Sequence, residues 1–211
     1  FRQDEEIEIL RGDLVEILMN AIEGVPCYFN QFIDHIEQND DQVKVHFKDG
    51  RNECYDLVIG ADGIHSATRS LVFNQDEYEI VYLGTYVSIF SIPNYLNLNH
   101  TEVMCDANQK LAIISSDKDP KFAQAGLLFR SPNVLNNIRN ENQQQQFLRD
   151  IFQDFGWELP KILELMSNSD DFYFDLVAQV KMKSWTKGRV VLLGDAGYCA
   201  SLHSGQGSSL A

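Results

Sequence analysis

Two aspartates, each placed after a short apolar run, are the residues in this sequence whose position best fits ligand chemistry. Asp62 follows the run Tyr55–Gly60 and precedes Gly63, and Asp195 directly follows Arg189–Gly194. Both runs are apolar enough to be strands buried on both faces of a parallel sheet. Open α/β sheets bind ligands beyond the carboxyl ends of their strands, where a carboxylate can accept hydrogen bonds. The two aspartates are therefore candidate ligand-binding residues.

Glycines near both aspartates allow sharp turns and close approach of the backbone to a ligand. Gly63 follows Asp62, and a Gly-x-Gly pair, Gly205 and Gly207, leads through Ser208 toward a predicted helix start. Free N–H groups at a helix start suit an electron-rich or anionic group. Simpler interpretations stay open, because Asp62 in a strand-to-helix turn can merely cap backbone amides and a Gly-x-Gly pair can be a linker.

The surrounding patterns predict nucleotide-domain pieces at both ends of the chain and an antiparallel insertion between them. Helical spacing of apolar residues predicts an amphipathic helix over residues 5–23. The middle of the chain predicts strands and two helices separated by polar turns, with an exposed Asn/Gln-rich loop at 133–146 leading into the first helix. We expect three parts, at residues 1–79, 80–180 and 181–211.

The two aspartate segments resemble fingerprints of the flavoprotein hydroxylase family that includes para-hydroxybenzoate hydroxylase and the tetracycline-inactivating monooxygenases. Asp56–Arg69 resembles the Asp-Gly fingerprint of that family. Trp185–Ala196, with the trailing Gly-x-Gly, resembles its Gly-Asp fingerprint. Arg11, followed by Leu14 on the opening helix, looks like the flavin-contacting arginine of the family, although a solvated helix arginine is the simpler alternative.

The resemblance implies an α/β fold, with an incomplete Rossmann-type FAD-binding domain and an inserted, mostly antiparallel β-sheet substrate domain. It implies that Asp195 hydrogen-bonds the ribityl chain of FAD and that Arg11 lies near the pyrophosphate or ribityl group. Asp62 would shape the region near the pyrophosphate and the nicotinamide entry. The other implied cofactor-binding positions are Gly63, Gly194, Gly205, Gly207 and Ser208.

The implied activity is that of an FAD- and NAD(P)H-dependent monooxygenase. Dioxygen would form a flavin C4a-hydroperoxide, and one oxygen atom would enter a small aromatic or polycyclic substrate. Two alternatives are a flavin reductase or halogenase relative and a truncated or degenerate domain that does not catalyse. We name no catalytic side chain from the sequence.

The sequence departs from the family pattern at several positions. It reads Gly194–Tyr198 as Gly-Asp-Ala-Gly-Tyr where the family has Gly-Asp-Ala-Ala-His, and it has Leu202 for a proline and Ser209 for an asparagine. His203 is also unusual beside the expected flavin position. No Gly-x-Gly-x-x-Gly occurs in the 211 residues. We therefore expect a fragment without the N-terminal dinucleotide-binding motif.

Charge and composition limit the classes of partner that this chain is expected to bind. The net charge of −14 argues against nucleic acid or an anionic membrane surface, since both require a basic face. The apolar runs are too short for a membrane span. The four cysteines are far apart and form no Cys-x-x-Cys pair. We expect a cytoplasmic protein with reduced thiols and no metal site, and the sequence leaves its oligomeric state open.

Overall fold

A computed structural model describes residue 9 and residues 11–116, 119–135, 138, 140–201 and 204. The described strands form three sheets. The largest has the order β6-β7-β8-β5-β9, and all its neighbouring strands are antiparallel. These strands are β5 (Tyr78–Pro93), β6 (Thr101–Ala107), β7 (Lys110–Ser116), β8 (Phe122–Arg130) and β9 (Tyr173–Met182). The predicted mixed α/β fold with a mostly antiparallel insertion is confirmed.

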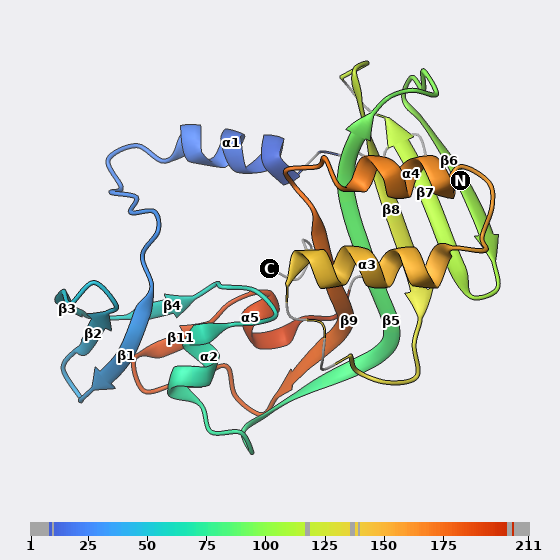
Figure 1. Cartoon of the computed structure of the whole chain (residues 1–211). Coiled ribbons are helices and arrows are strands. Elements are labelled where there is room, and N and C mark those ends of the chain that lie inside the picture. Colours follow the sequence, from blue (N-terminus) through green and yellow to red (C-terminus); the bar gives the residue numbers. More distant parts are fainter. Residues whose placement is uncertain are drawn as a thin grey trace.

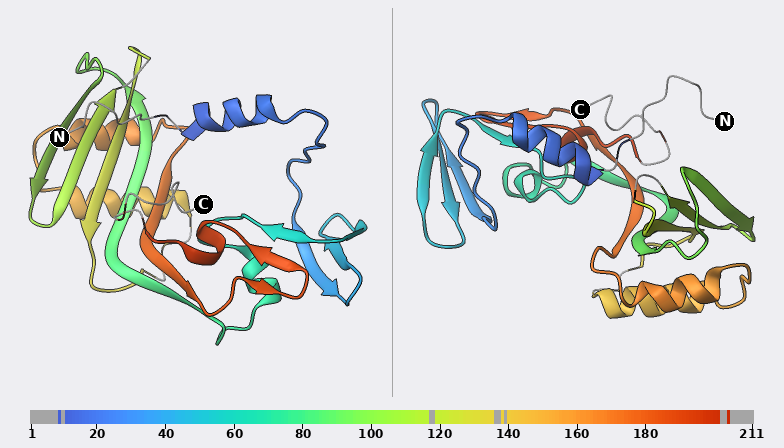
Figure 2. Two further views of the ribbon diagram at one scale, coloured as in Figure 1. Left: turned by 180° about the vertical axis from the view of Figure 1, so that it is seen from behind. Right: turned by 90° about the horizontal axis from the view of Figure 1, so that it is seen from above.

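Two helices, α3 (Glu141–Phe152) and α4 (Leu159–Met166), cover one face of this sheet (Figure 1; Figure 2, right). Alternate residues of the strands point toward the helices, so Leu127 and Phe129 of β8 pack with Phe152 and Ile162 in the main apolar core. Burying such side chains stabilises the fold by about 1.5 to 3 kcal/mol each. The helices thus hold the sheet in place from one side.

The other face of the sheet is not covered by these helices. Paired residues of adjacent strands point to the same face, so the register places one row across it: Asp175, Val87, Leu128 and Leu111. A second row contains Tyr173, Ile89, Gly126, Ile113 and Met104. We call this surface the open face. Its middle is mostly apolar.

Part of the Asn/Gln-rich segment is helical, where the sequence predicted a loop. Helix α3 begins at Glu141, where the Asn140 side chain accepts a hydrogen bond from the Gln143 backbone N–H. The Gln143–Gln146 run is therefore helical rather than part of a loop. Gln145 is buried and donates to Glu141 one turn earlier, so this polar run is not entirely a solvated face.

A small sheet brings together two segments that are far apart in the sequence, residues 58–60 and 186–192. Strand β11 (Val190–Leu192) pairs in parallel with β4 (Val58–Gly60) on one side and antiparallel with β10 (Thr186–Lys187) on the other. Helices α2 (Ala67–Val72) and α5 (Asp195–Tyr198) follow β4 and β11. The pairing of β4 with β11 confirms the predicted parallel arrangement.

The predicted single strand at Tyr55–Gly60 is wrong. The chain forms β3 (Asn52–Tyr55) in another sheet, with β1 (Ile33–Gln38) and β2 (Val43–Phe47), before β4 begins at Val58. The run is not buried on both faces either, because Leu57 is 53% and Ile59 57% exposed. An apolar run alone does not show where one strand ends and the next begins.

Helix α1 (Arg11–Ala21) lies apart from β4, α2 and α5, as Figure 1 and the left view of Figure 2 show. Its described part is shorter than the predicted helix over 5–23. It ends before Gly24, and its side chains Val15, Ile17 and Leu18 are more than half exposed. No helix among the described residues is long and apolar enough to cross a membrane.

Candidate functional site

The carboxyl ends of β4 and β11 lie side by side, and both candidate aspartates follow them. Leu192 pairs with Gly60 in parallel register, and the Leu193 N–H donates to the Gly60 carbonyl at 2.9 Å. Asp62 is two residues beyond β4, and Asp195 is the first residue of α5. The fold therefore brings together two motifs that are more than a hundred residues apart in the sequence, at the sheet edge where ligands of α/β proteins bind.

The Asp62 carboxylate is used within its own loop. One oxygen accepts from the Ser66 hydroxyl and the other from the Thr68 backbone N–H at 2.8 Å. Partial burial opposes ionisation, but these hydrogen bonds outweigh it and hold the pKa of Asp62 below its usual value. Gly63 has φ +78°, a conformation that glycine adopts without strain. Asp62 thus orders the turn that leads into α2.

Arg69, the last residue of the Asp-Gly motif, connects the two halves of the site. Its side chain is 1% exposed and donates to the Ala196 carbonyl at 2.8 Å and to the Ile64 carbonyl at 2.6 Å. Its guanidinium lies 5.0 Å from the centre of the Tyr78 ring. Burial lowers the pKa of Arg69. Arg69 therefore fixes α5 relative to the Asp62 loop. We did not select it from the sequence, although its place in the Asp-Gly motif was a usable signal.

Asp195, like Asp62, is an exposed residue just beyond the end of its strand. Gly194 precedes it with φ +60° and ψ −139°, a conformation essentially restricted to glycine. The buried Cys199 thiol lies nearby; burial raises the pKa of Cys199, and the carboxylate of Asp195 raises it further. The backbone at Gly194 thus turns Asp195 out of the sheet, where it can accept hydrogen bonds from a ligand.

The structure leaves little room for a side chain at position 197. A Cβ atom there would lie 3.1 Å from the Leu192 Cβ and 3.4 Å from the Trp185 Cδ1. Trp185 also packs against Tyr198, with ring centres 4.7 Å apart. The departures from the family pattern at positions 197 and 198 therefore belong to one packing arrangement around Trp185.

A second set of hydrogen bonds holds the turn before β11. Gln38 of β1 donates to the Lys187 carbonyl and accepts from the Arg189 N–H at 2.7 Å. The Arg189 guanidinium donates to the carbonyls of Asp40 and Asp56. Gly188, at φ +61°, has the Gln38 side chain where a Cβ would lie. The segment Gly188–Arg189 thus joins the β1–β2–β3 sheet to β11.

Part of the predicted site lies outside the described residues. Arg11 is the first residue of α1, but its side chain lies outside the described part of the structure. Also outside it are Leu202, His203, Gly205, Gly207, Ser208 and Ser209. A contact of Arg11 or of the Gly-x-Gly segment with a cofactor remains a prediction.

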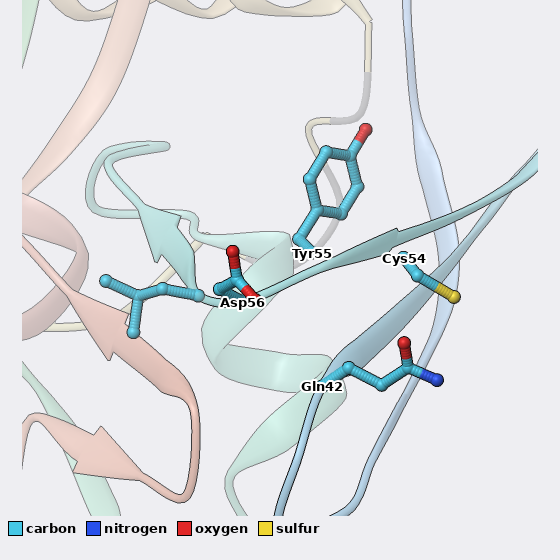
Figure 3. Close-up of a pocket in the computed structure, with 5 residues that line it drawn as sticks. Gln42, Cys54, Tyr55 and Asp56 are labelled. Atoms are coloured by element: carbon cyan, nitrogen blue, oxygen red, sulfur yellow. The ribbon is translucent and has the colours of Figure 1, made fainter.

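An open pocket lies at the connection between β3 and β4 (Figure 3). Its lining residues are Gln42, Cys54, Tyr55, Asp56 and Leu57. None of these is a predicted site residue. Within the described part of the chain, no group of three or more His, Cys, Asp or Glu side chains is arranged to hold a metal ion.

A parallel strand pair with both candidate aspartates beyond its carboxyl ends, joined to an antiparallel sheet, is an α/β arrangement in which ligands bind at that edge. The family model described as FAD binding domain matches residues 9–211, and the chain belongs to that family. The predicted membership in the flavoprotein monooxygenase family is confirmed.

The relatives and neighbours agree with this family. A flavin-dependent monooxygenase from Legionella longbeachae is 62% identical over 211 residues, which are 100% of this chain and 54% of the relative. The crystal structure of tetracycline destructase Tet(51) has a TM-score of 0.91 at 66% identity and covers 96% of this chain and 54% of its own. Tet(55) has a TM-score of 0.90 at 56% identity, with the same coverage. The chain therefore spans about half the length of the relatives it matches.

The described residues fit part of an FAD site. The exposed carboxylate of Asp195 is an acceptor for hydroxyl groups, as a ribityl chain would require. A Cβ added at Gly63 would have no atom within 4 Å, so the backbone there is open to a ligand. Asp62 fits a structural role better than direct contact, because both of its oxygens already accept hydrogen bonds.

Proposed function

We propose that the protein carrying this chain is an FAD-dependent monooxygenase that acts on a small aromatic or polycyclic substrate. In this proposal NAD(P)H reduces the bound flavin, which with dioxygen forms a C4a-hydroperoxide that transfers one oxygen atom. The polypeptide binds the cofactor, orients the substrate and excludes water. The observation that carries the proposal is the exposed Asp195 carboxylate beside the Asp62 loop, at the carboxyl ends of two parallel strands.

Asp195 is proposed to accept a hydrogen bond from a ribityl hydroxyl of FAD. Asp62, Gly63 and Gly194 shape the two turns around it. Arg11 and the Gly205–Ser208 segment are proposed to contact the pyrophosphate or ribityl group and the flavin pyrimidine edge. These roles rest on the family motifs together with the position of the two turns at one sheet edge.

The open face is proposed to cover the substrate. Its middle rows place the half-buried Ile89, Ile113 and Leu128 near one another, which suits a flat, largely apolar ring system. Polar residues border these rows, among them Gln124 and Ser91 on one side and Arg130 on the other. Tetracycline is a reasonable first probe, since the two similar solved structures are named tetracycline destructases.

The test is turnover by the protein encoded in the whole reading frame that contains this chain. Purified with FAD, it should oxidise NADPH or NADH faster when tetracycline is added, with uptake of dioxygen and a product heavier by one oxygen atom in mass spectrometry. A protein that binds FAD but forms no oxygenated product from tetracycline or simple phenols would point to the reductase or non-catalytic alternative.

A further inference from the structure

His65 makes a direct side-chain contact between the Asp62 loop and the five-stranded sheet. Its Nε2 atom lies 2.8 Å and 3.0 Å from the two carboxylate oxygens of Asp175 on β9. The residues are 110 positions apart in the sequence. His65 is two residues beyond Gly63, so this contact joins the proposed cofactor half of the protein to the proposed substrate half.

On the sheet side, two further hydrogen bonds hold the Asp175 carboxylate in place. Asp175 also accepts from the Tyr173 hydroxyl at 3.0 Å and from the Leu176 N–H at 2.8 Å. Its side chain is only 13% exposed, compared with 64% for His65. Phe174 and Leu176 of the same strand pack toward α3 and α4. By strand alternation, Asp175 therefore points to the open face, in the row of Val87 and Leu128.

The loop side is also fixed. The Ile64 carbonyl, directly before His65, accepts from Arg69 at 2.6 Å. Ser66, directly after it, donates its N–H to the Gly63 carbonyl at 3.0 Å and its hydroxyl to Asp62. The backbone on both sides of His65 is thus held by hydrogen bonds, so the imidazole extends from an ordered loop to an ordered carboxylate.

We propose that His65 and Asp175 form a positioning pair that fixes the open face of the sheet relative to the Asp62 loop, and thereby the substrate relative to the flavin. The inference rests on the proposed function. Neither residue needs to touch substrate or cofactor. Small errors in the placement of reacting groups reduce rates strongly, so even a modest contact between the two halves affects the reaction.

A double-mutant cycle in the FAD-loaded protein of the whole reading frame tests the pair. His65→Ala and Asp175→Ala should each raise the KM for tetracycline about threefold and lower the yield of oxygenated product per dioxygen consumed. The double variant should be no worse than either single variant. His65→Gln retains a donor near the Nε2 position and should recover most of the loss. His35→Ala, at an exposed histidine of β1 beside Glu37, is the matched control.

A second readout does not depend on turnover. Hydrogen–deuterium exchange should become faster in residues 62–66 and 173–177 of the His65→Ala protein, and His65→Gln should restore it. Unchanged exchange, or additive losses in the double variant, would overturn the pair. So would a His65 effect on the KM for NADPH that Asp175→Ala does not share, because it would indicate a direct contact of His65 with the reductant.

The two proposals fail in different ways. If the wild-type protein forms no oxygenated product, the proposed function is wrong, and hydrogen exchange alone decides whether the contact joins the two halves. If the wild-type protein is active and the single variants match the His35→Ala control in both readouts, the proposed function stands and the positioning role is wrong.

Discussion

The five-stranded sheet and the small mixed sheet of β10, β11 and β4 are stabilised in different ways. In the former, a continuous apolar core that includes Phe90, Leu127 and Phe129 packs under two helices. In the latter, the apolar clusters are small, and single polar side chains such as Arg69 and Arg189 bind carbonyl groups of distant segments. Truncating a packed core side chain leaves a cavity, whereas removing a hydrogen-bonding side chain leaves polar groups without their partner. Substitutions should therefore affect the two regions differently.

The largest loss of stability is expected from Phe129→Ala. Phe129 is 2% exposed and packs against four other aromatic rings. Its truncation should lower the free energy of unfolding by about 4 kcal/mol in denaturant titrations. Phe122→Ala, on the same strand but 55% exposed, should change it by less than about 1 kcal/mol. Equal losses in the two variants would show that the apolar core does not dominate this region.

Arg69→Met should cost about 3 kcal/mol, because it leaves the buried carbonyls of Ala196 and Ile64 without their donor. Methionine keeps much of the side-chain volume, so the loss reports mainly the hydrogen bonds. Arg51→Met is the control, since Arg51 pairs with Asp49 and Glu53 at the surface, and it should cost less than about 1 kcal/mol. A cost as small for Arg69→Met would contradict the connecting role of Arg69.

Glycine-to-alanine substitutions compare the two regions directly. In Gly60→Ala the new Cβ would lie 2.8 Å from the Thr68 Cβ and 2.9 Å from the Leu192 Cδ2, so β4 or α2 must shift. We expect a loss of about 2 kcal/mol in thermal or denaturant unfolding. Gly126→Ala on β8 meets only an ordinary contact of 3.6 Å with the Ile113 Cβ. It should be neutral or slightly stabilising, and a loss equal to that of Gly60→Ala would argue against the close approach at Gly60.

The smallest stability effect is expected at Asp62, and it depends on pH. The pKa of Asp62 is lower in the folded protein than in the unfolded chain, so its ionised form stabilises the fold above the unfolded pKa. That contribution is lost as the pH falls through the lowered pKa. Asp62→Asn should cost about 1 kcal/mol at pH 7 and less at about pH 2. A pH-independent cost, measured by urea titration at both pH values, would argue against ionic stabilisation of the loop.

The difference between apolar packing and single polar contacts also determines which features could be predicted from the sequence. The alternating pattern at Val43–Phe47 and the helical spacing at Leu159–Met166 match β2 and α4 as observed, because apolar periodicity reports which face is buried. The division of Tyr55–Gly60 between two sheets was missed, because Tyr55 and the apolar residues after Asp56 were taken as one strand, although Asp56 lies in a bend between β3 and β4. The sequence also does not show that Arg69 reaches Ala196 or that His65 reaches Asp175. These contacts depend on how distant segments meet in the fold.

The role of Asp195 in binding FAD is tested most directly by the affinity of the whole-reading-frame protein for FAD. We predict that Asp195→Ala weakens FAD binding about tenfold or more in a fluorescence titration, because a ribityl hydroxyl loses a charged acceptor. Asp154→Ala, an exposed aspartate in the turn after α3, should leave the affinity unchanged. If Asp195→Ala binds FAD as tightly as the wild-type protein and the Asp154→Ala control, Asp195 does not hold the cofactor.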